Sequence, residues 1–259
     1  MGIREVLKVL DLGAATELEL QTQYRLMPIR YDRATLLPRA KEVTDWIRPQ
    51  LEQGGFGSVA SVVFADKASR GMRPLAEMDL TDKVLYRALV RHISDSLPPH
   101  LVERSRYEDF QTSVAPVDTT IGYVSKTDVA AYYEYVDHAL LRDELLAQTG
   151  TGPAVLLLMD VLRAVMGRSV GLPQVHSSSD ILGDCYIDPI RRRLVRSGFK
   201  TSSYSDDFRI YSTTLAEAKL ALEACAFEAR SLGLVLNEGK TLTYTAEHYF
   251  KSLDSFDDA

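Results

Sequence analysis

Tyr204-Ser205-Asp206-Asp207 stands between two short runs of β-forming residues, at positions 202–204 and 208–211. This arrangement predicts a β-hairpin whose tip holds two carboxylates out into a cleft. Carboxylate oxygens are the hard ligands that Mg²⁺ prefers, and Mg²⁺ supports phosphoryl transfer. Pairs of aspartates are also common at solvated turns, so this pair alone does not establish a metal site.

A third aspartate, Asp128, follows a predicted strand further upstream in the chain. Two-metal catalysis needs carboxylates from separate segments that converge on ions about 3.5–4 Å apart. A carboxylate that ends one strand and a carboxylate pair on a neighbouring hairpin meet that need. We therefore expect Asp128 to lie beside Asp206 and Asp207.

Five segments in a fixed order resemble the motifs of reverse transcriptases. They are Arg73-Pro74-Leu75 with Asp82-Lys83, Asp128 with Tyr133, the Leu-Pro-Gln-Gly-x-x-x-Ser-like run from Gly171 to Ser179, the Tyr-x-Asp-Asp box Tyr204-Ser205-Asp206-Asp207, and the Gly-Leu-x-Leu-Asn-x-x-Lys-Thr-like run at 232–241. The resemblance covers residues 70 to 245, roughly, and is closest to the bacterial abortive-infection and other defence-associated enzymes.

This resemblance implies an α+β fold, a right-hand polymerase palm with an antiparallel sheet backed by helices and with N-terminal fingers. It places the fingers at 1–105, the first catalytic strand of the palm at 106–135, fingers and palm helices at 136–170, and the rest of the palm at 171–259. In the family a helical thumb follows the palm. Since the chain ends at Ala259, soon after the last palm motif, we expect no thumb within these residues. Either the thumb belongs to a part of the protein outside this sequence, or a partner protein or a second copy supplies its function.

The resemblance also implies the catalytic residues. The catalytic set is Asp128, Asp206, Asp207 and Lys240, and the metal set is Asp128, Val129, Asp206 and Asp207. The expected cofactor is Mg²⁺, with Mn²⁺ as an alternative. Asp207 supports the site by family analogy, and Lys240 is similar to the lysine that protonates the leaving pyrophosphate. An exposed loop lysine is the alternative for Lys240.

Four residues are expected to contact substrate. Arg73 resembles the fingers arginine that forks onto the triphosphate, and Tyr133 resembles the bulky residue that excludes a ribose 2′-hydroxyl. Gln174 resembles the residue that contacts template or nucleotide, and Ser179 closes the same motif. The alternatives are a turn arginine, a core aromatic and a helix-capping glutamine.

Two positions depart from the family pattern. Val175 stands where the motif has glycine, and Asp180 stands where proline is common. The loss of glycine removes conformational freedom, which favours specialised synthesis such as a single-nucleotide repeat or template-independent extension. His176 either touches substrate or packs at the start of the following helix.

Bulk properties limit the class of protein. The chain has 259 residues with 46% hydrophobic content, enough for one large domain or two interleaved ones. No apolar run approaches the length of a membrane span, the start lacks a signal-peptide core, and the two cysteines form no metal-binding spacing. These features predict a cytoplasmic protein with no membrane partner.

A net charge of −6 argues against a strong non-specific grip on nucleic acid, although a channel with local positive charge stays compatible with it. Two basic clusters occur, at Arg191, Arg192, Arg193, Arg196 and Lys200 and at Lys67, Arg70 and Arg73. Each cluster is equally compatible with a solvated face.

Periodicity predicts the main elements. Helices are expected at 4–10, 40–52, 137–146 and 154–165. A further helix begins at Thr81 or Asp82 as its cap and ends before Pro98, and another begins at Ser177 with Pro189 as a kink or an end. The last helix is expected at 215–232, with one side formed by Leu220, Ala221, Ala224, Cys225 and Phe227. Strands are expected at 59–65 and before Asp128, and segments 234–236 and 242–244 are expected to pair with each other.

These observations predict a reverse transcriptase-like DNA polymerase that transfers nucleotides from dNTPs by two-metal catalysis. Its partners would be a DNA product and either an RNA template or a structured non-coding RNA. Its biological role would be bacterial antiphage defence. One alternative is an RNA-dependent RNA polymerase, against which Tyr133 and the Arg73 context argue. Another is a non-catalytic scaffold that binds RNA or protein, against which the three retained aspartates argue.

Overall fold

A computed structural model of the chain describes residues 2–24, 26–66, 71–103, 105–112 and 120–254. Lys67 and Arg70 of the second basic cluster lie outside these residues. The chain divides into two compact units. Unit 1 comprises Met1–Val102 and Asp137–Leu182, and unit 2 comprises Glu103–Val136 and Gly183–Ala259.

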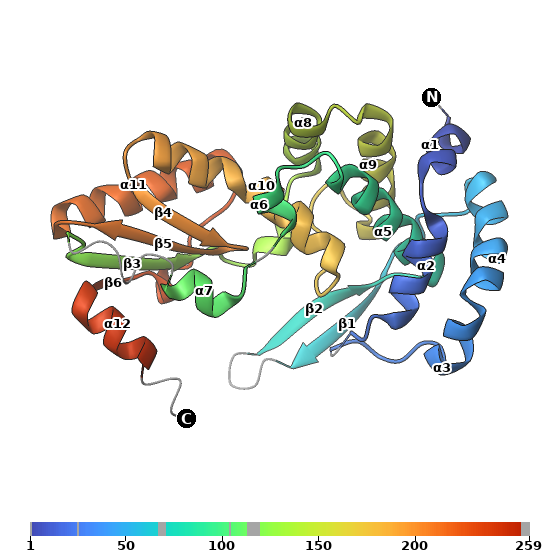
Figure 1. Cartoon of the computed structure of the whole chain (residues 1–259), viewed down its shortest axis with the longest axis horizontal. Helices are drawn as coiled ribbons and strands as arrows, with labels where there is room; N and C mark the ends of the chain where they lie inside the picture. The colour runs from blue at the N-terminus through green and yellow to red at the C-terminus, as the bar shows by residue number, and fades with distance from the viewer. Residues whose placement is uncertain (1, 25, 67–70, 104, 113–119, 255–259) are drawn as a thin grey trace. The chain divides into compact units, whose positions relative to one another are not determined.

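Unit 1 consists of helices and one two-stranded hairpin (Figure 1). Its elements are α1 (Ile3–Val9), α2 (Leu12–Gln21), α3 (Arg33–Leu36), η1 (Leu37–Arg39), α4 (Ala40–Glu52), β1 (Ser61–Asp66), β2 (Met72–Glu77), α5 (Leu80–Ser94), α6 (Pro99–Val102), α8 (His138–Thr149) and α9 (Gly152–Met166). Helix α10 (Ser177–Arg196) contains the boundary between the two units.

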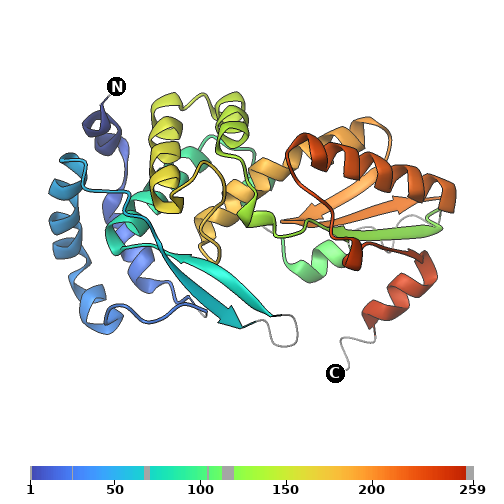
Figure 2. The same ribbon diagram turned by 180° about the vertical axis from the view of Figure 1, so that it is seen from behind.

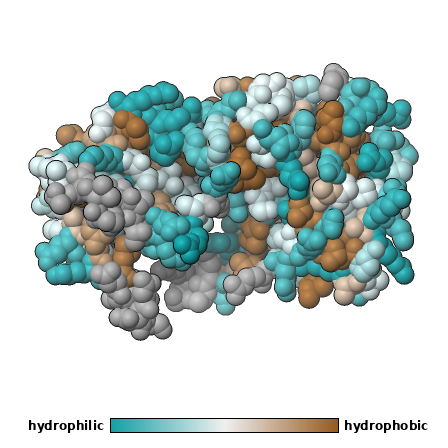
Figure 3. All heavy atoms as spheres, viewed as in Figure 1, coloured by the Kyte–Doolittle hydropathy of each residue, from teal (hydrophilic) through white to brown (hydrophobic). Residues whose placement is uncertain are grey.

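The core of unit 1 forms around α5, whose residues are buried on nearly every side. Helices α2 and α9 both pack on it, and their apolar faces exclude water from the interior. The predicted helix at 154–165 is therefore confirmed as a buried element. On the hairpin, by contrast, the large apolar side chains of Val62, Phe64 and Met72 are exposed. On the face in Figure 3, hydrophobic residues form patches among hydrophilic ones.

The predicted cap of α5 is wrong. Asp79 occupies the N-cap position, and the Asp82 carboxylate instead accepts hydrogen bonds from the backbone amides of Gly57 (2.6 Å) and Ser58 (3.1 Å). Burial raises the pKa of Asp82, although these hydrogen bonds oppose the shift. Asp82 therefore fixes the loop after α4 to the start of α5.

Unit 2 is built on a four-stranded antiparallel sheet with strand order β4-β5-β3-β6. Its elements are α7 (Tyr107–Thr112), β3 (Tyr123–Asp128), η3 (Tyr132–Glu134), β4 (Lys200–Tyr204), β5 (Asp207–Ser212), α11 (Leu215–Ser231), η4 (Glu238–Lys240), β6 (Leu242–Thr245) and α12 (Ala246–Asp254). Figures 1 and 2 show α11 on one face of the sheet and α7 and α12 on the other.

Alternation along the strands assigns residues to the two faces of the sheet. Val124 and Tyr211 pack with Tyr249 of α12 on one face. Phe208 and Ile210 have the opposite parity on β5 and are fully buried, which places them on the face that α11 covers. Both faces of the sheet are therefore covered.

Three sequence predictions for unit 2 need correction. Pro189 does not end α10, which continues to Arg196. Segment 234–236 does not pair with 242–244, because β6 pairs with β3 and Leu236 bridges Val129 instead. The side of α11 that faces the sheet is Ala218, Ala221, Cys225 and Ala229, whereas Leu220 and Phe227 are 59% and 72% exposed. Small residues allow α11 to approach the sheet closely.

The described part of the chain contains no helix that combines the length and the apolar character of a membrane span.

Candidate active site

The sheet of unit 2 brings the three predicted aspartates together. Asp128 is the last residue of β3 and lies directly opposite Asp207, the first residue of β5. The Val129 amide donates a hydrogen bond to the Asp206 carbonyl at 3.2 Å, and the Asn237 amide donates to the Asp128 carbonyl at 2.8 Å. The positions of these carboxylates therefore depend on backbone hydrogen bonds from three chain segments.

The Tyr-Ser-Asp-Asp box forms the predicted hairpin tip. Tyr204 pairs with Asp207 at the ends of β4 and β5, which leaves Ser205 and Asp206 as a two-residue loop. Ser205 has φ +52° and is the one central residue in the left-handed region, as in a type II′ turn. This turn suits the right-handed twist of a hairpin, so the Asp-Asp pair is held at a defined place.

Asp128 has one oxygen engaged and one without a partner. Lys240 donates to Oδ2, whereas Oδ1 is buried and lacks a hydrogen-bond partner among the described residues. The Asp128 residue is only 4% exposed. A buried oxygen of this kind costs free energy unless a ligand or ion satisfies it. Lys240 thus lies at the site where the sequence predicted it.

Burial first, and then repulsion from the Asp207 and Asp128 carboxylates, together raise the pKa of Asp206 to about 6, although a backbone hydrogen bond and the Lys240 charge act in the opposite direction. Ionisation of Asp206 is therefore disfavoured both by burial and by the two neighbouring carboxylates. A divalent cation would relieve this repulsion, because opposite charge favours the ionised form of a carboxyl group.

Asp207 has a different environment from Asp128. Its Oδ1 lies 3.8 Å from the Arg209 guanidinium, and its Oδ2 accepts a hydrogen bond from the Tyr107 hydroxyl at 3.2 Å. No sequence motif marks Arg209 or Tyr107 as functional residues. Arg209 follows Asp207 at a spacing of two in a strand, a signal that it shares a face of the sheet with Asp207.

These residues fit Mg²⁺ or Mn²⁺ as the expected cofactor. The described residues contain no ready-made group of three or more His, Cys, Asp or Glu side chains around a metal position. Mg²⁺ commonly binds through only one or two carboxylates, with water and substrate phosphates as its other ligands. Asp128, through its unpaired Oδ1, and Asp206, whose carboxyl group is repelled by its neighbours, provide two carboxylate ligands.

Tyr133 lies next to the hairpin tip. Its hydroxyl is 3.3 Å from the Ser205 hydroxyl, and it belongs to the short η3 turn that follows Ala131, whose φ of +48° reverses the chain. The adjacent Tyr132 is buried and donates to the Gly183 carbonyl at 2.5 Å. The turn therefore points the neighbouring rings differently, so that Tyr132 is the core aromatic and Tyr133 stays partly exposed.

The other three predicted substrate contacts lie in unit 1. Arg73 is a half-buried residue of β2, and the Gln174 amide donates to the carbonyl of the next residue, Pro74, at 3.4 Å. Ser179 is fully buried, with its hydroxyl bonded to the Pro173 carbonyl (2.5 Å) and the Tyr86 hydroxyl (2.8 Å). Ser179 thus has a packing role here, and its contact with substrate stays a prediction.

Val175 has φ +71°, a conformation that a β-branched residue rarely adopts. The backbone thus has the shape that glycine would accept at this motif position. The substitution of valine for glycine preserves the turn at the cost of local strain.

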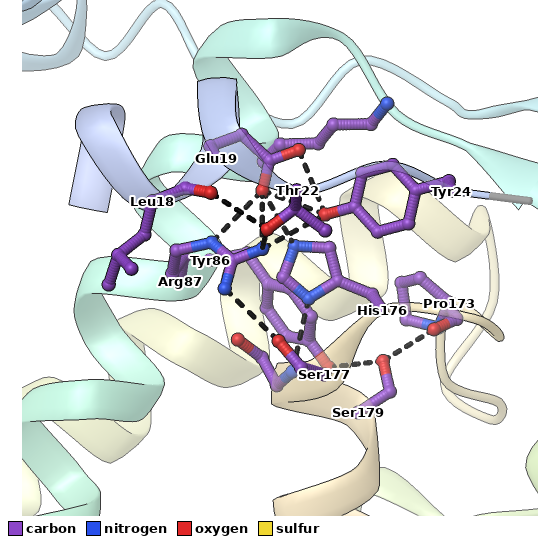
Figure 4. A network of polar contacts seen from close by, with 12 residues as sticks. Leu18, Glu19, Thr22, Tyr24, Tyr86, Arg87, Pro173, His176, Ser177 and Ser179 are labelled. Atoms are coloured by element: carbon purple, nitrogen blue, oxygen red, sulfur yellow. Dashed lines mark hydrogen bonds and ion pairs between the residues drawn. The ribbon is translucent and has the colours of Figure 1, made fainter.

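Figure 4 shows a buried polar network in unit 1 that the sequence analysis missed. Arg87 donates to Glu19 Oε2 through Nε (3.0 Å) and Nη2 (2.7 Å), and Tyr24 also donates to Glu19. Burial works against the charged form of Glu19, but contacts to His176 and Arg87 lower its pKa. His176 stacks on Tyr24 with ring centroids 5.7 Å apart, in agreement with packing at the helix start.

Among known proteins, similarity to this chain is found at the level of the fold. No family model and no curated protein matches the chain. The structure of apo telomerase from Candida tropicalis matches with a TM-score of 0.53 at 11% identity, over 80% of this chain and 49% of that chain. Telomerase from Candida albicans, in complex with a TWJ fragment of telomeric RNA, matches with a TM-score of 0.49 at 10% identity, over 72% and 41%.

This chain spans about half of the length of the first telomerase and less of the second. At such low identity the likeness shows the fold alone. The chain thus has a mixed helix and sheet fold with antiparallel sheets, similar to that of telomerase.

Proposed function

We propose that this chain is the core of a reverse transcriptase-like nucleotidyltransferase that adds deoxynucleotides to a growing DNA strand. The observation that carries the proposal is the convergence of Asp128, at the end of β3, with the Asp206-Asp207 hairpin tip. The similarity to the telomerase fold supports a polymerase at a coarse level.

In this proposal Asp128 and Asp206 hold the metal, with the Val129 backbone and Asp207 adjacent to it. Mg²⁺, or Mn²⁺, would activate the primer hydroxyl and neutralise the charge of the triphosphate when bound. The Lys240 side chain is half-exposed and its ammonium group carries three N–H donors. Once Lys240 separates from Asp128, it is suited to donate a proton to the departing pyrophosphate.

Substrate selection falls to other side chains of the chain. The Tyr133 ring would pack under the incoming sugar and exclude a 2′-hydroxyl, and its hydroxyl contact with Ser205 would hold the ring in place. Arg73, Gln174 and Ser179 of unit 1 stay predicted contacts of nucleotide or template. A template of RNA, a bacterial antiphage role and a cytoplasmic setting are parts of the same proposal that rest on sequence resemblance.

The test is incorporation of labelled nucleotides by the purified chain, with dNTPs and NTPs compared in the presence of Mg²⁺ or Mn²⁺. We expect incorporation of dNTPs that is lost in the double variant Asp206→Ala/Asp207→Ala. Preference for NTPs would indicate an RNA-dependent RNA polymerase. Incorporation that is equal in the double variant would contradict a catalytic role for the hairpin.

The proposal of specialised rather than ordinary templated synthesis rests on the departure of Val175 from the glycine of the motif. Sequencing of nucleic acid that purifies with the protein separates the two. A product of one repeated nucleotide indicates template-independent extension, and a discrete structured RNA indicates a dedicated template.

A further inference from the structure

Asp128 and Asp207 form a cross-strand pair of like charges. They lie directly opposite each other on β3 and β5, so their side chains point to the same face of the sheet. Like charges in such a pair destabilise the sheet unless each has its own cation. The structure provides two, Lys240 for Asp128 and Arg209 for Asp207.

The two cations differ in how easily they leave. The Lys240 side chain is 49% exposed and contacts Asp128 from a short 3₁₀ turn. Asp128 is buried in this pair, but the half-exposed Lys240 side chain can return to water, so Lys240 can release Asp128 when a metal arrives. The Arg209 side chain is 0% exposed.

Arg209 is fixed by contacts on all sides. Its Nε donates to the Tyr249 hydroxyl at 2.9 Å, one Nη donates to the Phe208 carbonyl at 3.0 Å, and the other donates to the Tyr107 hydroxyl at 3.4 Å. The guanidinium also lies 5.0 Å from the centre of the Phe110 ring. Helices α7 and α12 thus hold it against β5, and it cannot follow the carboxylate.

This cluster contacts both oxygens of Asp207, one through a long ion pair and the other through a hydrogen bond. Oδ1 faces Arg209 at 3.8 Å and Oδ2 accepts from Tyr107 at 3.2 Å, whereas Oδ1 of Asp128 lacks a partner among the described residues. Asp207 is thus held by fixed groups, whereas Asp128 has a buried oxygen that a cation would satisfy.

We propose that Arg209, held by Tyr107 and Tyr249, is a positioning residue that anchors Asp207 and keeps it out of the metal ligand set. The protein then offers Asp128 and Asp206 as its two carboxylate ligands. This inference rests on the proposed function, because it concerns the metal of the same site.

The test measures Mn²⁺ binding to the purified full chain by the electron paramagnetic resonance signal of the free ion, without turnover. We expect Asp128→Asn to weaken binding about tenfold or more, and Asp207→Asn to change it by no more than about twofold. Arg209→Met removes a nearby positive charge and frees Asp207, so binding should tighten about tenfold.

Binding of Mn²⁺ to Arg209→Met can tighten because a positive charge is lost or because Asp207 becomes a ligand. The double variant Arg209→Met/Asp207→Asn separates these two causes. If Asp207 becomes a third ligand, the double variant loses most of the gain. Arg193→Met, which removes a cation paired with Glu228 on the helices of the same unit, is the matched control and should leave binding unchanged.

Arg209 is buried, so its loss can prevent folding. In that case Tyr107→Phe removes one of the two contacts of Asp207 and keeps the buried charge, and we expect binding to tighten about threefold.

An Asp207→Asn chain that loses Mn²⁺ as strongly as Asp128→Asn would overturn the inference while the proposed metal site stands. Binding that Asp128→Asn does not change would instead contradict the metal site itself, and with it the proposed function.

Discussion

Asp206 experiences the repulsion at the hairpin tip most directly, and this repulsion makes stability depend on pH. Burial and the neighbouring carboxylates raise its folded-state pKa from 3.8 to about 6. A raised pKa gives stability that is fully present below pH 4, approximately, and lost as pH rises through 6. We expect the metal-free chain to lose about 1–3 kcal/mol of unfolding free energy across this window, because Asp206 is only partly buried.

Urea unfolding between pH 4 and 7 checks this prediction. Asp206→Asn cannot ionise, so its stability should stay nearly flat over the same window and exceed that of the wild type at pH 7. Saturating Mg²⁺ should flatten the wild-type curve, because a cation favours the ionised carboxyl group. A wild-type curve that already matches Asp206→Asn without metal would refute the assigned environment.

The backbone conformation of Val175 leads to a second prediction for a single residue. Its φ of +71° costs a β-branched residue about 1–3 kcal/mol, more than the conformational freedom that glycine loses on folding. We expect Val175→Gly to raise the unfolding free energy by about 0.5–1 kcal/mol. The neighbouring Gln174 lacks a positive φ, so Gln174→Gly should lower the unfolding free energy. A loss in both variants would contradict the strain.

The aspartates and Lys240 were visible in the sequence because ordered motifs mark them. The role of Arg209 could not be predicted from the sequence, because its partners Tyr249 and Tyr107 are 40 and 102 positions away. These residues become neighbours only when α12 and α7 pack on the sheet. Glu19 and Arg87, 68 positions apart, were missed for the same reason. Roles that depend on distant contacts need the tertiary structure.

At the scale of elements, boundaries were predictable where local chemistry sets them. The helix predicted from Asp137 begins there, because the Asp137 carboxylate accepts from the amides of Ala139 and Leu140. Strand pairing was less predictable. Segments 234–236 and 242–244 are close in the chain, but 242–244 pairs with β3, and Leu236 bridges Val129, the residue after β3. Sequence proximity favours a hairpin only when no third strand competes.

The buried pair that joins α2 to α5 allows a test of the elements. Arg87→Met leaves the Glu19 carboxylate buried without its main cation, so we expect a loss of about 3–5 kcal/mol of unfolding free energy. Glu19→Gln in the same chain removes the stranded charge and should recover much of the loss. A double-mutant cycle by chemical unfolding measures this. A double variant as unstable as Arg87→Met would contradict the pairing.

At the scale of the whole molecule, each unit is built from two separate stretches of sequence. The prediction that 171–259 belongs to a palm stays a prediction. Residues 171–182 lie in unit 1, where Ser177 and His176 contact Arg87 and Glu19. The fold similarity to telomerase extends over most of the chain, although only 11% of residues are identical. Packing and topology can persist where side chains change, so a shared fold does not by itself assign a reaction.

The central claim is that Asp128 and Asp206 hold a metal that drives nucleotide addition. The most direct measurement is the rate of dNTP incorporation as a function of Mg²⁺ concentration for the wild type, Asp128→Asn and Asp206→Asn. The account predicts incorporation that requires Mg²⁺ and falls about 10³-fold or more in each variant, since each removes a ligand at the reacting centre. Incorporation by either variant at the wild-type rate and Mg²⁺ dependence would contradict it.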